Sequence, residues 1–381
     1  SLKNNTTANN NVAIGFCALE QNSTGADNTA IGASALDANT TASNNVAIGY
    51  VALALNTTGT SNVAVGAGSL DANTTASGNT AVGKTSLGAN TTGAENTTVG
   101  SSAGSLNTTG CRFTAVGFES GKAHTTGIEN SLFGRKSGLA LTTGDNNTFI
   151  GSYSGVTQTT ADNNTGVGKS ALAANTSGAG NTAVGMQALD ANTTASNNTA
   201  IGLNSMTANT TGADNTAVGR TSMESNTEGD NNVAVGLDAL ALNTTGEGNV
   251  AVGYASLAAN TTANNNTAVG IQSLDANTEG HSNTAVGKGS LGANTTADQN
   301  TAVGFNALTD NTTGTNNVAV GNSSLLDNTT GEQNVAIGDT ALSNNTTASA
   351  NTSVGANSLL TNTTGCQNTA VGTSALLDCT E

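Results

Sequence analysis

Apolar residues occur along this chain in short groups that repeat one arrangement. In a representative group, Val46 and Ile48 flank Ala47, Gly49 follows, and Leu53 comes four residues later. Large and small residues that alternate with a period of two are typical of an extended strand. β-Branched side chains also favour strands over helices. Each group therefore predicts one short β-strand that ends in a tight corner at the glycine.

Gly49 is one of 22 glycines that are spaced by 17 residues without an insertion. These repeat glycines begin with Gly15 and Gly32 and end with Gly355 and Gly372. A unit of this length cannot bury its own apolar face, so it must stack against its neighbours. The period therefore predicts an all-β protein: a rod-like parallel β-solenoid of 22 coils, forming a single repeat domain over residues 1–381.

The repeat also predicts which columns of residues lie inside the coil. We expect the Ile48 and Leu53 columns to line the interior, together with the Ala or Ser that stands three residues after every repeat glycine. The Ala47 column, which is alanine in 17 of the 22 coils, would then form an apolar stripe on the outside. A soluble rod rarely exposes such a stripe along its length. Three arrangements would cover it: two identical chains, a second sheet of the same coil, or an ordered surface such as ice.

Two asparagine columns mark the turns of the repeat. The first column, represented by Asn45, precedes the strand in 21 coils, and the second, represented by Asn56, follows the glycine by seven residues in 18 coils. Stacked asparagines form ladders of side-chain amides, and asparagine tolerates left-handed backbone geometry. We expect both columns to be structural. The second column also creates Asn-Thr-Thr acceptor patterns for glycosylation, but the ladder already explains them and we predict no sugar attachment.

The run Asn45-Val46-Ala47-Ile48-Gly49, with the small residue Ala52 after it, resembles the head repeat of trimeric autotransporter adhesins of the YadA type. Variant coils such as residues 181–194 also resemble repeats of phage tail fibres. The resemblance covers almost the whole chain and implies a homotrimeric, left-handed parallel β-roll within a longer fibre. The unit of the adhesin head is shorter than the one in this chain, and the stalk and membrane anchor of that family are absent from this sequence.

The coils between about residues 100 and 168 depart from the pattern. The leucine column becomes glycine at positions 104, 121, 138 and 155, and four of the six phenylalanines gather nearby. One interpretation is a belt that contacts a glycan or another anionic surface group, because aromatic, Arg and Lys side chains suit such ligands. The other interpretation is structural, with Phe filling the space that Leu leaves. The candidate belt consists of Arg112, Phe113, Phe118, Lys122, Phe133, Arg135, Lys136, Phe149 and Tyr153.

Composition bears on the remaining function classes. The formal net charge of -16 argues against nucleic-acid binding, which requires a basic surface. No apolar run approaches the ~20 residues of a membrane span. The only two histidines, His124 and His281, are far apart, so one chain offers no His-based catalytic pair. No motif indicates a metal or cofactor site. We therefore expect no enzyme, no cofactor and no membrane insertion.

The leading hypothesis is a structural and adhesive fibre segment of a phage tail fibre or bacterial surface adhesin. It would be extracellular, on a cell surface or on a virion, and it would attach to a surface glycan or another surface receptor as a homotrimer. The alternative is an ice-binding solenoid, because paired threonines such as Thr57 and Thr58 stack in columns that can order water. A glycan-cleaving solenoid enzyme is a weaker third hypothesis. It depends on one column of aspartates, which consists of Asp37, Asp71, Asp190 and Asp275. These aspartates alternate with unrelated residues between coils, which argues against a paired-carboxylate site.

Overall fold

The computed structural model describes residues 1–379, and their only regular elements are short β-strands of three residues each. The chain comprises two units, Ser1–Thr194 and the residues from Ala195 onward. In the first unit the strands are β1 (Val12–Ile14), β2 (Thr29–Ile31), β3 (Val46–Ile48), β4 (Val63–Val65), β5 (Thr80–Val82), β6 (Thr97–Val99), β7 (Thr114–Val116), β8 (Ser131–Phe133), β9 (Thr148–Ile150), β10 (Thr165–Val167) and β11 (Thr182–Val184). In the second they are β12 (Thr199–Ile201), β13 (Thr216–Val218), β14 (Val233–Val235), β15 (Val250–Val252), β16 (Thr267–Val269), β17 (Thr284–Val286), β18 (Thr301–Val303), β19 (Val318–Val320), β20 (Val335–Ile337), β21 (Thr352–Val354) and β22 (Thr369–Val371).

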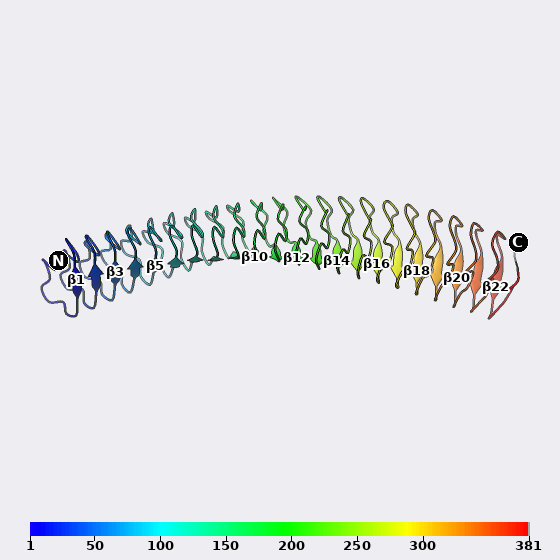
Figure 1. Cartoon of the computed structure of the whole chain (residues 1–381), viewed down its shortest axis with the longest axis horizontal. Helices are drawn as coiled ribbons and strands as arrows, with labels where there is room; N and C mark the ends of the chain where they lie inside the picture. The colour runs from blue at the N-terminus through cyan, green and yellow to red at the C-terminus, as the bar shows by residue number, and fades with distance from the viewer. Residues whose placement is uncertain (380–381) are drawn as a thin grey trace. The chain divides into compact units, whose positions relative to one another are not determined.

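Within each unit every strand pairs in parallel with the strand of the next coil, so the strands lie side by side along one wall of the stack (Figure 1). Equivalent repeat positions face each other, as Ala217 faces Ala234 and Ala234 faces Ala251. The predicted parallel β-solenoid with one coil per repeat is confirmed for both units. Residues 1–379 contain no helix long and apolar enough to cross a bilayer.

The repeat glycines form the predicted corner at the end of each strand. Gly236 has a φ of +139°, and a Cβ atom added there would lie 2.5 Å from the carbonyl oxygen of Gly253 in the next coil. L side chains rarely adopt this φ, and the short distance leaves no room for one. The corner therefore requires glycine for both its backbone angle and its close stacking.

Non-glycine residues also adopt left-handed backbone angles in every regular coil. In the coil that follows β15, Ala255 and Leu257 have φ values of 51° and 50°. A third left-handed position occurs just before the first asparagine column, as at Asn231 with a φ of 59°. An alanine or leucine in this region costs roughly 1–2 kcal/mol. Burial of the whole Leu257 side chain offsets that cost.

The structure reverses the predicted faces of the strand. Ala47 is fully buried, whereas Ile48 keeps 37% of its surface exposed. The prediction that the Ile48 column lies inside and the Ala47 column outside is therefore wrong. The leucine column was predicted correctly, because Leu53 is fully buried and packs with the strand alanines in one core. The leucines occupy most of the narrow interior, so the facing strand has room for little more than a methyl group at each coil.

Candidate functional surfaces

Both asparagine columns are buried except at the ends of the chain, and both hydrogen-bond the same turn of each coil. The side-chain amides of Asn45 and Asn56 both donate hydrogen bonds to the carbonyl oxygen of Gly59, at 3.0 and 2.9 Å. The side-chain oxygen of Asn45 accepts a hydrogen bond of 2.9 Å from the backbone N–H of Asn62 in the next coil. The structural role expected for these residues is confirmed.

The second asparagine column is a ladder of amides from coil to coil. Asn73 donates to the side-chain oxygen of Asn56 at 2.8 Å, and Asn90 donates to that of Asn73 at 3.0 Å. These side chains are fully buried, and both N–H groups of Asn73 are engaged because its Nδ2 also donates to Ala76. From Asn39 onward the Asn-Thr-Thr patterns therefore present no accessible amide for glycosylation in the folded chain, whereas Asn5 of the first pattern is exposed.

His124 replaces asparagine in this ladder and keeps the hydrogen bond to the asparagine of the preceding coil. Its Nδ1 lies 2.9 Å from the side-chain oxygen of Asn107, and its Nε2 lies 3.2 Å from the side-chain nitrogen of Asn130. The ring stacks on Phe113 with the centroids 4.1 Å apart. Burial lowers the pKa of His124 to about 4, so the imidazole is neutral at neutral pH.

Two members of the predicted belt belong to the core and not to a surface. Phe113 and Phe149 are fully buried and fill the space beside the glycines that replace leucine. A Cβ atom added at Gly104 would lie 2.7 Å from Phe113, and one added at Gly155 would lie 2.6 Å from Phe149. The prediction that Phe113 and Phe149 contact a ligand is wrong, and the structural interpretation holds for them.

Phe118 and Phe133 are exposed, but they lie on different columns. Phe133 ends β8 and belongs to the outward side of the strand, with 40% of its surface exposed. Phe118 follows a repeat glycine directly and is 48% exposed on the corner of the coil. The backbone N–H of Lys136 donates to the carbonyl oxygen of Phe118, which sets Arg135 beside Phe118 in the next coil.

The basic residues of the belt are held by partners of different kinds. Lys122 and Lys136 share the carboxylate of Glu119, at 2.8 and 3.6 Å. The hydrogen bond from Lys122 is the main cause that lowers the pKa of Glu119. Arg135 instead hydrogen-bonds the hydroxyl of Tyr153, and its guanidinium lies 5.0 Å from the centre of that ring.

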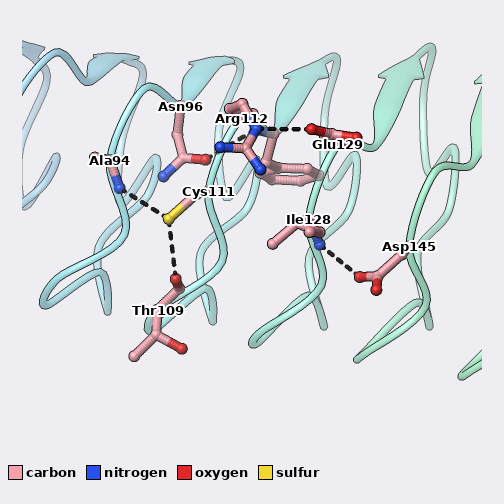
Figure 2. A network of polar contacts seen from close by, with 9 residues as sticks. Ala94, Asn96, Thr109, Cys111, Arg112, Ile128, Glu129 and Asp145 are labelled. Carbon is pink, nitrogen blue, oxygen red and sulfur yellow. Dashed lines mark hydrogen bonds and ion pairs between the residues drawn. The ribbon is translucent and has the colours of Figure 1, made fainter.

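Arg112 lies apart from this cluster, on another turn of the coil. It forms an ion pair of 2.9 Å with Glu129 of the next coil (Figure 2). The same view shows how the neighbouring turn is fixed: the backbone N–H of Ile128 donates to the carboxylate of Asp145, and that of Ala94 donates to the sulfur of Cys111. Arg112 is therefore part of a polar network that joins successive turns.

A regular surface is formed by the two residues of each strand that flank the buried one. We call it the outward strand face. Its position before the repeat glycine is Val in 15 coils, Ile in 6 and Phe133 in one, and its other position is Thr in 14, Val in 7 and Ser131 in one. Ile201 and Val235 are 39% and 37% exposed. No position of this face holds a charged residue, so it is an uncharged and largely apolar surface in every coil.

The paired threonines of the turn differ in their exposure. The hydroxyl of Thr244 donates to the carbonyl oxygen of Thr261 in the next coil at 2.9 Å, whereas Thr245 is exposed. Only the second threonine column therefore faces solvent fully, and Glu228 and Glu279 interrupt it. This column is a less regular surface than the outward strand face.

Residues 1–379 enclose no pocket and hold no cluster of three or more His, Cys, Asp or Glu side chains placed to bind a metal ion. A ligand of the described part would contact an open surface. Comparison with protein-family models finds no match to this chain, and comparison with curated proteins finds none either.

Proposed function

We propose that this chain is a structural and adhesive fibre segment that assembles as a homotrimer through its outward strand face. The observation that carries the proposal is the absence of any charged residue from that face, although the chain has a formal net charge of -16. A contiguous apolar surface on a soluble protein marks an interaction site. Copies of the same chain present the same period, so their side chains can interlock coil by coil.

Threefold assembly follows the resemblance of the repeat to the heads of trimeric adhesins, which also implies a left-handed winding. Three copies around an axis along the stack would cover each outward strand face in a closed arrangement. The role would be non-catalytic and extracellular, on a cell surface or a virion. Attachment would depend on repeated weak contacts along three chains. The open, pocket-free surface of residues 1–379 supports such a role.

Ice binding is the second candidate, and one observation favours it. Thr occupies 14 of the 22 positions in the first column of the outward strand face, next to a column of Val and Ile. Hydroxyl and methyl groups at a regular spacing of about 4.8 Å can order water in a repeating pattern. A chain that remains monomeric and changes the shape of growing ice crystals would favour this candidate over the fibre.

The test replaces two neighbouring valines of the outward strand face, Val235→Lys with Val252→Lys. The matched control places the same charges on the exposed turn column, Thr245→Lys with Thr262→Lys. Sedimentation velocity should show the unmodified chain and the control as trimers and the face variant as a monomer. A face variant that remains trimeric would show that the contact lies elsewhere.

A further inference from the structure

One corner of the first unit carries a cluster of aromatic and basic side chains that the outward strand face does not include. Phe118 and Arg135 follow successive repeat glycines, and Tyr153 lies in the coil after them. The backbone N–H of Tyr153 donates to the carbonyl oxygen of Arg135 at 3.0 Å, so the three side chains lie on adjacent coils. A repeat glycine separates this corner column from the outward strand face in each coil.

The net charge of this corner is positive, whereas that of the whole chain is negative. Lys122 and Lys136 share the carboxylate of Glu119, and Arg135 lies beside Tyr153. The corner thus holds three basic side chains and one carboxylate, whereas the chain as a whole carries a formal net charge of -16. Both lysines contact Glu119, but within residues 1–379 no carboxylate lies within ion-pair distance of Arg135. The guanidinium is exposed, and the Tyr153 ring holds it in place.

We propose that this corner patch, defined by Phe118, Lys122, Arg135, Lys136 and Tyr153, binds acidic saccharides. The inference deepens the adhesive part of the proposed function and rests on it. Aromatic rings offer a flat apolar surface to the C–H face of a pyranose, and a guanidinium matches the two oxygens of a carboxylate or the oxygens of a sulfate. A saccharide fits an open corner that has no pocket.

The size of the patch favours a saccharide over a protein partner. The cluster is confined to three coils, and the same corner column carries serine on either side, at Ser101 and Ser152. A stable protein interface needs about 800 Å² on each partner. A cluster of three coils is instead of a size that one or two sugar rings can cover. Repetition in three chains would raise the avidity of a contact that is weak in one chain.

The test uses the full chain and three soluble probes: sialyllactose, which carries a carboxylate, sulfated lactose, and unmodified lactose. Titrations followed by calorimetry or ligand-observed NMR should show millimolar binding of at least one acidic probe, and lactose should bind at least tenfold more weakly. The comparison of the two acidic probes tells whether the patch selects a carboxylate or a sulfate. Equal binding of lactose, or no binding of any probe, would overturn the proposal.

Two variants localise the binding, and a third is the control. Arg135→Ala and Phe118→Ala should each weaken binding of the acidic probe at least fivefold. Arg220→Ala removes the same side chain from the same corner column, where the neighbouring coils carry Leu203 and Leu237, and it should leave binding unchanged. If Arg220→Ala weakened binding of the acidic probe as much as Arg135→Ala does, the binding would reflect nonspecific charge. That result would overturn the proposal. A trimer that binds no acidic saccharide would refute the patch alone, whereas a monomer that binds one would refute the trimeric fibre alone.

Discussion

The Nδ1 atom of His124 lies 2.9 Å from the side-chain oxygen of Asn107, at the point where the amide ladder changes from asparagine to histidine. Asn107 already donates through its amide nitrogen to Asn90 and Gly110, so its oxygen is the group that faces the imidazole. His124 therefore donates from Nδ1, and its Nε2 accepts from Asn130. A neutral imidazole of this tautomer retains the donation that a ladder asparagine makes to the asparagine of the preceding coil.

This geometry predicts a loss of stability as the pH falls from about 6.5 to about 4. The pKa of His124 is lowered from its ordinary value of 6.5 to about 4 in the folded chain, because the ring is buried. In that window the unfolded chain binds a proton at this residue and the folded chain does not, so the free energy of unfolding decreases as the pH falls. The expected loss is about 3 kcal/mol, complete near the lower pKa.

His124→Asn is the control for this prediction, because it restores the residue that other coils have at this position. Thermal unfolding of the variant and the unmodified chain should be compared at pH 7 and pH 4. The carboxyl groups titrate equally in both proteins, so the difference between them isolates His124. An equal change of the unfolding midpoint in both proteins would contradict the assignment of a neutral buried imidazole.

Gly236→Ala should destabilise the second unit by about 3 kcal/mol or more, because the added Cβ meets the backbone of the next coil at a strained φ. Gly248→Asn is the matched control. Gly248 has a φ of +65°, and its equivalent in the previous coil is Asn231. The control should change stability by less than about 1 kcal/mol. Denaturant unfolding followed by circular dichroism measures both, and similar losses would contradict the special role of the repeat glycine.

Asn243→Ala should cost about 2–4 kcal/mol, because it leaves the oxygen of Asn226 and an N–H of Asn260 buried without their ladder partner. Thr245→Ala is made two residues away on the exposed turn and should cost less than about 0.5 kcal/mol. Hydrogen exchange of the backbone amides should show the loss of protection in the coils around Asn243. Unchanged protection there would mean that the ladder contributes little to stability.

Phe149 and Gly155 should show strong coupling in a double-mutant cycle. Phe149→Ala leaves a cavity and Gly155→Leu clashes with the ring, so each single change should cost about 3 kcal/mol or more. The double variant recreates the alanine and leucine of a regular coil, and Gly155 already has the left-handed φ of 57° found at the leucines. It should therefore lose less than either single variant. Thermal unfolding measures the stability of the three variants. If the double variant lost as much stability as the two single variants together, the idea that Phe149 fills the space left by leucine at Gly155 would be refuted.

The sequence allowed the fold to be predicted, but not the orientation of the strand. The spacing of the repeat glycines fixes the coil length and the register. Alternation within Val46–Ile48 shows that two faces exist, but it does not say which one is buried, because either Ala47 or its larger neighbours can face a core of unknown width. The left-handed φ of leucines such as Leu257 was missed as well, since leucine carries no signal for that conformation.

The candidate belt contained both core residues and surface residues, and composition alone could not distinguish them. Phe113 and Phe149 replace strand or turn residues that point inward, whereas Phe118 occupies a corner column that is exposed in most coils. If each phenylalanine had been assigned to its position in the repeat, Phe113 and Phe149 would have fallen on inward-facing columns. The replacement of leucine by glycine at Gly104 and Gly155 would have indicated the space that they fill. The partners of Lys122, Arg135 and Lys136 depend on side-chain geometry, which the repeat pattern does not contain.

The mass of the unmodified chain in solution, measured by multi-angle light scattering, tests the central claim most directly. If the uncharged outward strand face packs against identical chains, the mass will be three times the 36.9 kDa of one chain, and it will stay so on dilution to micromolar concentration. A mass of one chain across that range would contradict the account, because the outward strand face would then be exposed to solvent along both units.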